Sequence, residues 1–259
     1  MENKTLGFIG GGRITSIFLH GFEMANASFS EIIVFDPDKN VLTNLQAKIP
    51  EIICESENLQ SSANCDIVIL AIHPPIMVET LTKIKPFLKD DAILLSLAPK
   101  ISIQKIKEVL GGFSNISRAI PSAPGIILQG IHPVAFSDEM SEDKKDLILE
   151  ILESLGETPV VIESKLEAYA LICAMGSTYF WFQLNKLQEL AMKFGMDKTE
   201  SKEVIAGMIE GSVNTLLFSD YTPEEVMDLI PVKPIGEFEE TIKGFYEEKL
   251  TALFEKIKT

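Results

Sequence analysis

A glycine-rich segment near the start of the chain limits the possible folds more than any other part of the sequence: Leu6-Gly7-Phe8-Ile9-Gly10-Gly11-Gly12-Arg13-Ile14-Thr15. An apolar run leads into it and an amphipathic run follows, which predicts a strand, a tight turn and a helix. Gly10 permits the turn, and Gly12 lets backbone N–H groups approach an anion at the positive end of the helix. We predict a diphosphate site made by Gly10, Gly11, Gly12, Arg13 and Ile14; a purely structural glycine turn is the alternative.

The next apolar run ends in an acid, Ile33-Val34-Phe35-Asp36, 26 residues after Gly10. At the end of the second strand of such a fold, a carboxylate accepts a hydrogen bond from the 2′-OH of an adenosine ribose. The same charge repels a 2′-phosphate, and only Lys39 lies close in the sequence to offset it. Asp36 therefore favours NADH as the form of NAD(P)H that binds. The alternative is that Asp36 only begins the turn Asp36-Pro37-Asp38 and caps the next helix.

Short apolar runs alternate with amphipathic stretches through the first half of the chain, which predicts an α/β fold with a Rossmann-type, doubly wound parallel sheet. The predicted strands are Thr5–Ile9, Glu31–Phe35, Asp66–Ala71, Ala92–Ser96, Ile116–Ala119, Ile131–Ala135 and Thr158–Ile162. After about Ser164 the strand-like runs stop, and the predicted helices are Leu166–Phe194, Lys198–Phe218, Pro223–Leu229 and Gly236–Ile257. We expect a dinucleotide-binding domain over residues 1–162 and an all-α C-terminal domain over residues 163–259.

The charge balance bears on the possible partners. The chain has 38 Asp and Glu residues against 23 Lys and Arg residues, a formal net charge of −15. A surface this negative repels phosphate backbones and anionic lipids, so we expect no nucleic acid and no membrane among the partners. The stretch from Ala168 to Asn185 carries no formal charge and just reaches spanning length. Its polar residues favour a helix that is buried by its own fold or by a partner subunit.

Cysteine and histidine are too few and too scattered to predict a metal site. Cys54, Cys65 and Cys173 are far apart and lack a Cys-x-x-Cys spacing, so we expect reduced thiols in a cytoplasmic protein. The N-terminus lacks the apolar stretch of a signal peptide, which agrees with a cytoplasmic location. His20 and His132 are interpreted as structural residues.

Three further segments follow predicted strands and should border the crevice at the carboxyl ends of the parallel strands. They are Ala71-Ile72-His73-Pro74, Ser96-Leu97-Ala98-Pro99 and the stretch from Arg118 to Gly125. We predict cofactor contacts from residues on all three segments, namely Ala71, Ile72, His73, Pro74, Ala98, Pro121 and Ser122. Alternatively, His73 is a solvated turn residue, and the third segment is a plain connection between domains.

In order and spacing these segments resemble the pyrroline-5-carboxylate reductase family, the NAD(P)H enzymes of the last step of proline biosynthesis. The glycine loop is similar to that family's G-F-I-G-x-G-N-M-A, Ala71 to Pro74 to its A-V-K-P, and Arg118 to Pro124 to its R-x-M-P-N-T-P. The resemblance covers essentially the whole chain. It implies an NAD(P)-dependent oxidoreductase acting on CH–NH groups, with the C-terminal helices forming a homodimer or a higher homo-oligomer.

The departures from the family's pattern fall on the substrate side. Cys173 to Tyr179 keeps only the Gly and the Tyr of the family's S-G-S-G-P-A-Y. Where the family carries S-P-G-G-T-T, its cradle for the substrate carboxylate, this chain has Val232-Lys233-Pro234-Ile235-Gly236-Glu237. The resemblance implies substrate contacts from Met175, Gly176, Lys233 and Gly236, with Ser177, Thr178 and Tyr179 as candidate catalytic residues.

We expect this chain to reduce 1-pyrroline-5-carboxylate or a related imine. Hydride transfer to a protonated C=N bond requires a dry, well-oriented slot and little further catalytic machinery. Two alternatives stay open because a fold does not determine a function. In the first alternative the chain is an oxidoreductase of the same architecture that acts on a different small substrate. In the second it is a nucleotide-binding homologue without catalytic activity.

Overall fold

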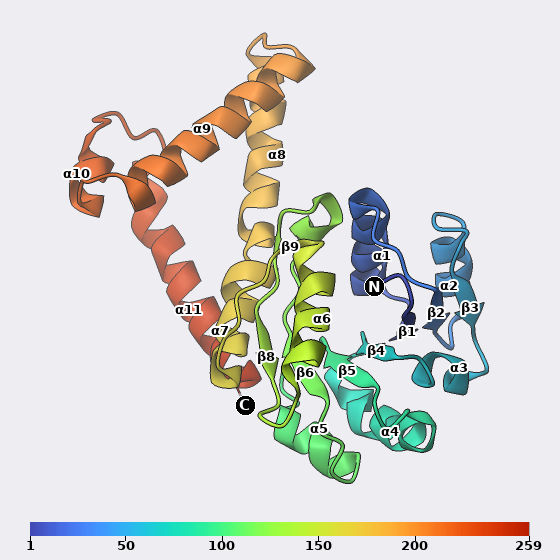
Figure 1. The fold of residues 1–259 in the computed structure, drawn as a ribbon. Helices are drawn as coiled ribbons and strands as arrows, with labels where there is room; N and C mark the ends of the chain where they lie inside the picture. The colour runs from blue at the N-terminus through green and yellow to red at the C-terminus, as the bar shows by residue number, and fades with distance from the viewer. Residues whose placement is uncertain (259) are drawn as a thin grey trace. The chain divides into compact units, whose positions relative to one another are not determined.

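The computed structural model describes residues 1–258 and separates into two compact units. The N-terminal unit comprises Met1–Met175 together with the residues from Phe254 onward, and the C-terminal unit comprises Gly176–Leu253. All strands of the described chain belong to the N-terminal unit (Figure 1). Between residues 163 and 258 the regular elements are all helices, whereas the compact units divide at Gly176. A domain boundary between residues 162 and 163 stays a prediction.

The N-terminal unit is built on a seven-stranded sheet in the order β3-β2-β1-β4-β5-β6-β8. Its parallel strands are β1 (Thr5–Ile9), β2 (Glu31–Phe35), β3 (Ile53–Glu55), β4 (Ile67–Leu70), β5 (Ile93–Ser96) and β6 (Ile116–Ala119). β8 (Val134–Phe136) joins the edge antiparallel to β6, and a separate small sheet pairs β7 (Gly130–Ile131) with β9 (Gly156–Glu157). The predicted Rossmann-like sheet is confirmed. Its strand order reverses between β1 and β4, which is where such sheets bind ligands.

Helices cover both faces of this sheet. Leu6 and Phe8 of β1 join one buried apolar cluster with side chains of α1 (Arg13–Ala25), α2 (Lys39–Gln46) and α6 (Glu142–Glu153). Gly7 faces the other side, because successive side chains of a strand alternate. A Cβ at Gly7 would lie 1.9 Å from the Ser62 carbonyl oxygen of α3 (Leu59–Ala63), so α3 covers that second face. α4 (Pro74–Ile84) contacts both α3 and α5 (Ile103–Val109) (Figure 1).

Some predicted elements of the N-terminal unit differ from the structure. The predicted strand Ile131–Ala135 is divided into β7 and β8, because Pro133 has no N–H for a continuous ladder. The predicted strand Thr158–Ile162 is wrong: β9 ends at Glu157, and Val160 forms only an isolated bridge with Val134. β3 and α3 are absent from the prediction, since runs of 3 and 5 residues carry too little periodicity.

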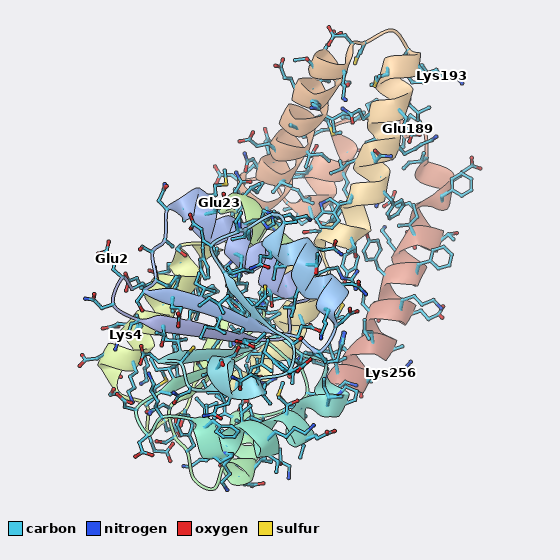
Figure 2. All side chains as sticks on the ribbon, turned by 90° about the vertical axis from the view of Figure 1, so that its right-hand side faces the viewer. Glu2, Lys4, Glu23, Glu189, Lys193 and Lys256 are labelled. Carbon is cyan, nitrogen blue, oxygen red and sulfur yellow. The ribbon has the colours of Figure 1, made fainter. Side chains whose placement is uncertain are left out.

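The C-terminal unit contains α8 (Ser177–Lys193), α9 (Lys198–Phe218), α10 (Pro223–Asp228) and most of α11 (Glu239–Ile257). Before it, α7 (Leu166–Tyr169) runs into a π-helical turn over Ala170–Ala174, so the predicted helix Leu166–Phe194 is interrupted. Glu189 and Lys193 on α8 are exposed and point outward (Figure 2). Within residues 1–258 no helix is both long enough and apolar enough to cross a membrane.

Candidate functional site

The predicted glycine loop joins β1 to α1 at the carboxyl edge of the sheet. Gly10 has a φ of +103°, in the left-handed region that favours glycine. A Cβ at Gly10 would lie 2.4 Å from the carbonyl oxygen of Ala71 and 3.1 Å from the side chain of Ile72. The structure therefore brings the glycine loop into contact with the predicted cofactor residues after β4, and only glycine fits at this close approach.

Gly12 is the N-cap of α1, and it leaves the N-terminal end of the helix uncovered. Its φ is −72°, and in the described chain no side chain caps α1 and no atom lies within 4 Å of the position a Cβ would take. The first N–H groups of a helix lack partners within the helix and form its positive end. The buried Thr15 donates from Oγ1 to the Gly10 carbonyl oxygen at 2.5 Å and so holds the loop. The N–H groups of Gly10 and Gly11 already donate to the Phe35 carbonyl oxygen and to Asp36 Oδ2, so the cradle of backbone donors that could hold an anion begins at Gly12, at the positive end of α1.

Asp36 follows β2 and lies beside the same loop. Its Oδ2 accepts from the Gly11 N–H at 2.8 Å, and its Oδ1 accepts from the Asp38 N–H at 2.9 Å. Asp38, rather than Asp36, caps α2. The Lys39 ammonium pairs with the Glu57 carboxylate at 3.0 Å, so the cation nearest to Asp36 in the sequence already faces an acid.

The other predicted cofactor residues lie on the turns after β4, β5 and β6. His73 is the N-cap of α4, and Pro74 is its first residue. Ala98 is buried in the turn after β5, and Pro121 and Ser122 are buried in the turn after β6. Ser122 Oγ accepts from the Ile131 N–H at 2.9 Å, so its hydroxyl already has a partner within the unit. All three turns lie at the carboxyl edge of the parallel strands, where doubly wound sheets bind ligands.

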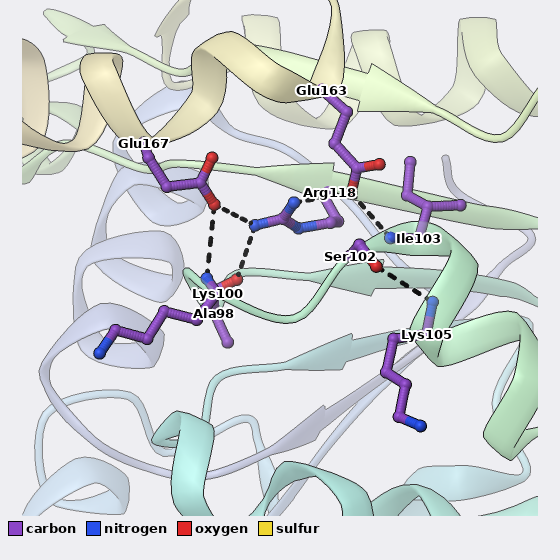
Figure 3. Close-up of polar contacts among 8 residues, drawn as sticks. All are labelled: Ala98, Lys100, Ser102, Ile103, Lys105, Arg118, Glu163 and Glu167. Atoms are coloured by element: carbon purple, nitrogen blue, oxygen red, sulfur yellow. Dashed lines mark hydrogen bonds and ion pairs between the residues drawn. The ribbon is translucent and has the colours of Figure 1, made fainter. Parts of the chain in front are cut away.

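Next to the turns after β5 and β6 lies an ionic cluster of the buried Arg118 and Glu167 and the partly buried Glu163 (Figure 3). Arg118, on β6, donates from Nη1 to Glu163 at 2.6 Å and from Nη2 to Glu167 at 2.8 Å. The side chains of Arg118 and Glu167 are each 1% exposed. Sequence reasoning missed this cluster. The available signal was a basic residue inside the apolar strand Ile116–Ala119, where a buried charge needs a partner.

The candidate catalytic residues open the first helix of the C-terminal unit. Gly176 is the N-cap of α8, and Ser177, Thr178 and Tyr179 form its first turn. The Tyr179 ring packs edge-on against Tyr246 of α11, with centroids 5.8 Å apart. Burial, and then the neighbouring Tyr246, raise the pKa of Tyr179, which makes its hydroxyl a weaker proton donor than that of an ordinary tyrosine.

The remaining candidate substrate residues are spread over both units. Met175 ends the first segment of the N-terminal unit. Lys233 and Gly236 share an exposed turn that leads towards α11, where the Gly236 N–H donates to the Lys233 carbonyl oxygen at 3.0 Å. Among the described residues, no group of three or more His, Cys, Asp or Glu side chains could hold a metal ion.

Two protein families match separate parts of the chain. Residues 5–100 match a family described as NADP oxidoreductase, coenzyme F420-dependent. Residues 163–257 match a family described as pyrroline-5-carboxylate reductase dimerisation. The first match contains β1 to β5 with the glycine loop, and the second contains α7 to α11.

Individual relatives are similar over nearly the whole chain. Pyrroline-5-carboxylate reductase 2 of Bacillus subtilis is 25% identical over 248 residues, which cover 95% of this chain and 88% of that protein. Pyrroline-5-carboxylate reductase of Escherichia coli is 24% identical over 97% of this chain and 93% of that protein. The crystal structure of Plasmodium falciparum pyrroline carboxylate reductase with NADP bound has a TM-score of 0.75 at 25% identity, covering 99% of this chain and 95% of that one.

Proposed function

This chain belongs to the pyrroline-5-carboxylate reductase family, and we propose that it is an NAD(P)H-dependent reductase of 1-pyrroline-5-carboxylate. When bound, the reduced nicotinamide supplies a hydride to the carbon of the substrate's C=N bond, whose nitrogen carries a proton, and the product is proline. A protonated imine is already electrophilic. The protein's main task is therefore to hold and orient the two reactants in a dry slot.

The observation that carries this proposal is the open cradle at the start of α1, in a chain that is similar to these reductases over nearly its whole length. With a net charge of −15, the chain could not attract a dinucleotide through its overall field. Backbone N–H groups at the positive end of α1 can attract the diphosphate locally. Such groups bind a diphosphate without any cluster of lysines.

Gly12→Ala tests the cradle. A methyl group at Gly12 meets no described protein atom within 4 Å but would obstruct the approach of the diphosphate to the N–H groups. We expect unchanged thermal stability and an NADH affinity that is at least about tenfold weaker by calorimetry. Gly207→Ala, on an exposed part of α9, is the matched control, because a Cβ there also has no described neighbour within 4 Å. Equal NADH affinity in Gly12→Ala and the wild type would reject the cradle.

We also propose that NADH is preferred over NADPH. Asp36 already accepts from the Gly11 N–H, so a carboxylate stands beside the loop that would hold the adenosine ribose. It would repel a 2′-phosphate, and Lys39 is engaged by Glu57. Asp36→Ala should raise the ratio of kcat/KM for NADPH to that for NADH by about tenfold or more. An unchanged ratio would contradict this assignment.

Steady-state assays with 1-pyrroline-5-carboxylate test the reaction itself. Cofactor oxidation that depends on this imine is the expected result. A second candidate is an oxidoreductase for another small substrate, which is favoured by Lys233 and Glu237 in the segment where the family carries S-P-G-G-T-T. Turnover confined to other imines, 2-oxo acids or β-hydroxy acids would support that candidate. Tight NADH binding without any turnover would indicate a non-catalytic homologue.

We propose that Ser177, Thr178 and Tyr179 contact the reacting substrate, and that Met175, Gly176, Lys233 and Gly236 contribute to its binding. Tyr179→Phe tests the one candidate proton donor, because it removes the hydroxyl and keeps the ring that packs on Tyr246. If the hydroxyl donates a proton in the reaction, kcat should fall about 100-fold. If Tyr179 only packs the helix, kcat should stay at the wild-type value.

A further proposal concerns assembly. The match of residues 163–257 to a dimerisation family indicates a homo-oligomer. We propose a homodimer formed through α8 to α11, whose apolar side chains are exposed in the single chain.

A further inference from the structure

The buried polar atoms without a hydrogen-bond partner gather at one place in the fold. In residues 1–258 they are Ser96 Oγ, Arg118 Nε and Glu167 Oε2. The last two belong to the ionic cluster of Figure 3, and Ser96 on β5 is the Cα partner of Arg118 on β6. Native proteins satisfy nearly all such atoms, so a group of them at the carboxyl edge of a sheet calls for a functional explanation.

Stability alone does not explain this cluster. Arg118 and Glu167 are almost completely buried, Glu163 is 29% exposed, and two carboxylates share a single guanidinium. Removing these charges from water costs about as much free energy as their mutual attraction contributes. Apolar residues of similar size would stabilise the core at least as well. What an ionic cluster adds is geometry, because the planar guanidinium fixes the directions of all its hydrogen bonds.

The groups held by this cluster belong to the predicted crevice. Arg118 Nη2 donates to the Ala98 carbonyl oxygen at 3.4 Å, and Glu167 Oε1 accepts from the Lys100 N–H at 3.4 Å (Figure 3). Lys100 has a φ of +72°, an uncommon conformation for a residue with a side chain, and this contact helps to hold it. Glu163 accepts from the Ile103 N–H at 2.7 Å, which fixes the start of α5. The cluster thus binds the whole turn between β5 and α5.

We propose that Arg118, Glu163 and Glu167 are positioning residues that set the turns after β5 and β6 around the nicotinamide half of the cofactor. This inference rests on the proposed function. Ala98 lies in the first turn, and Pro121 lies in the second turn, only three residues after Arg118. The diphosphate cradle is a separate part of the site, because β4 lies between β1 and β5 in the sheet. Disturbing the cluster should therefore change the reacting half of the cofactor and leave the binding of its other half intact.

Arg118→Lys and Glu167→Gln test this inference, with Glu163→Gln as a milder third variant in case the buried changes prevent folding. ADP-ribose, which lacks nicotinamide, probes the cradle by calorimetry. The emission of bound NADH probes the surroundings of the nicotinamide, and kcat with 1-pyrroline-5-carboxylate probes its alignment. Lys89→Met is the matched control, because it breaks an ion pair of 2.7 Å with Asp66 at the opposite, amino edge of the sheet.

We expect the cluster variants to bind ADP-ribose within about twofold of the wild type and to lose at least about half of the NADH emission change. Their kcat should fall roughly ten- to 100-fold. Lys89→Met should change none of the three. Folded cluster variants with wild-type emission and kcat would overturn the inference, and so would a parallel loss of ADP-ribose affinity. A wild type that does not reduce this imine would reject the proposed function, and the emission and ADP-ribose measurements would still decide the positioning role.

Discussion

At the scale of single residues, buried polar side chains of the N-terminal unit form hydrogen bonds with backbone groups of turns. These backbone groups have no partner in the seven-stranded sheet. His132 is fully buried, and its Nδ1 accepts from the Ser122 N–H at 3.4 Å. Its Nε2 lies 3.2 Å from the Leu155 carbonyl oxygen, so the neutral ring with a proton on Nε2 satisfies both contacts. Burial lowers the pKa of His132, and the contact with Leu155 only partly opposes this. A second proton would have to bind at Nδ1, where the Ser122 N–H already donates a hydrogen bond, so protonation would break this contact.

The free energy of unfolding should therefore fall in mild acid because of His132. Its pKa is lower in the folded than in the unfolded chain, so the unfolded state binds more protons once the pH drops below about 6.5. The loss should reach up to about 1.4 kcal/mol per pH unit, and His132→Gln should flatten this slope. Urea unfolding at several pH values between about 5 and 8 measures it. An identical slope in the variant would assign the loss to other groups.

Asp66 provides a second residue whose ionisation supports the fold. Burial alone would raise its pKa, but hydrogen bonds from Lys89 and Thr5 outweigh burial and hold the pKa at about 2. Its stabilising effect is complete above the unfolded pKa and is lost as the pH falls from about 4 to 2. Lys89→Met should cost about 1 kcal/mol at neutral pH and move acid unfolding to higher pH. Lys39→Met, which breaks the exposed pair with Glu57, should change neither the stability at neutral pH nor the pH of acid unfolding.

At the scale of helices and strands, local signals predicted the elements whose ends are marked in the sequence. β1, β2, β6 and α9 have their predicted bounds, because each is a continuous run between turn or capping residues. The π-helical turn over Ala170–Ala174 carries no such mark: neither Pro nor Gly interrupts the run. Local propensity therefore does not predict its position.

The candidate site also has one part that local sequence signals predicted and one part that they did not. The glycine loop and Asp36 lie within one strand–helix–strand unit, so their spacing alone predicted that they meet, and the Gly11–Asp36 hydrogen bond joins them. Arg118 and Glu163 are 45 residues apart, and no local pattern relates them. Only the sheet order and the path of the chain after β9 bring them together. The sequence therefore predicted that the glycine loop and Asp36 lie together and missed the ionic cluster, while the binding of a diphosphate at the loop stays a prediction.

The capping box of α9 gives a prediction at this scale. Asp197 Oδ1 accepts from the N–H groups of Thr199 and Glu200 at 2.8 and 2.9 Å, and Glu200 accepts from the Asp197 N–H. Asp197→Ala leaves these donors without a side-chain acceptor and should lower the free energy of unfolding by about 1 kcal/mol in urea titrations. Glu210→Ala, on the exposed face of the same helix, should change it by less than about 0.5 kcal/mol. Equal losses in the two variants would contradict the capping role.

At the scale of the whole molecule, apolar burial is distributed unequally between the two units. The buried apolar residues belong to the N-terminal unit, and in the described chain no hydrophobic side chain between Gly176 and Leu253 is buried. Trp181, Phe182, Phe218 and Phe245 of the C-terminal unit are each more than half exposed. Apolar exposure on this scale marks an association surface in a folded protein. Taken with the dimerisation family match, it predicts that this unit acquires its core from a second copy of the chain.

The single tryptophan makes that prediction measurable. Trp181 is 51% exposed in one chain, and we expect it to be buried in the assembly. Dilution should therefore shift its emission to longer wavelength as the assembly dissociates.

Phe182→Glu places a charge beside Trp181 on α8 and should give a monomer by sedimentation at concentrations where the wild type is assembled. Met24→Glu, at an apolar position of the N-terminal unit that is also more than half exposed, should leave the assembly intact. Because the C-terminal unit has so little core of its own, its α-helical signal should fall together with dissociation. A Phe182→Glu monomer with full helicity and an unshifted Trp181 emission would show that the unit folds without a partner.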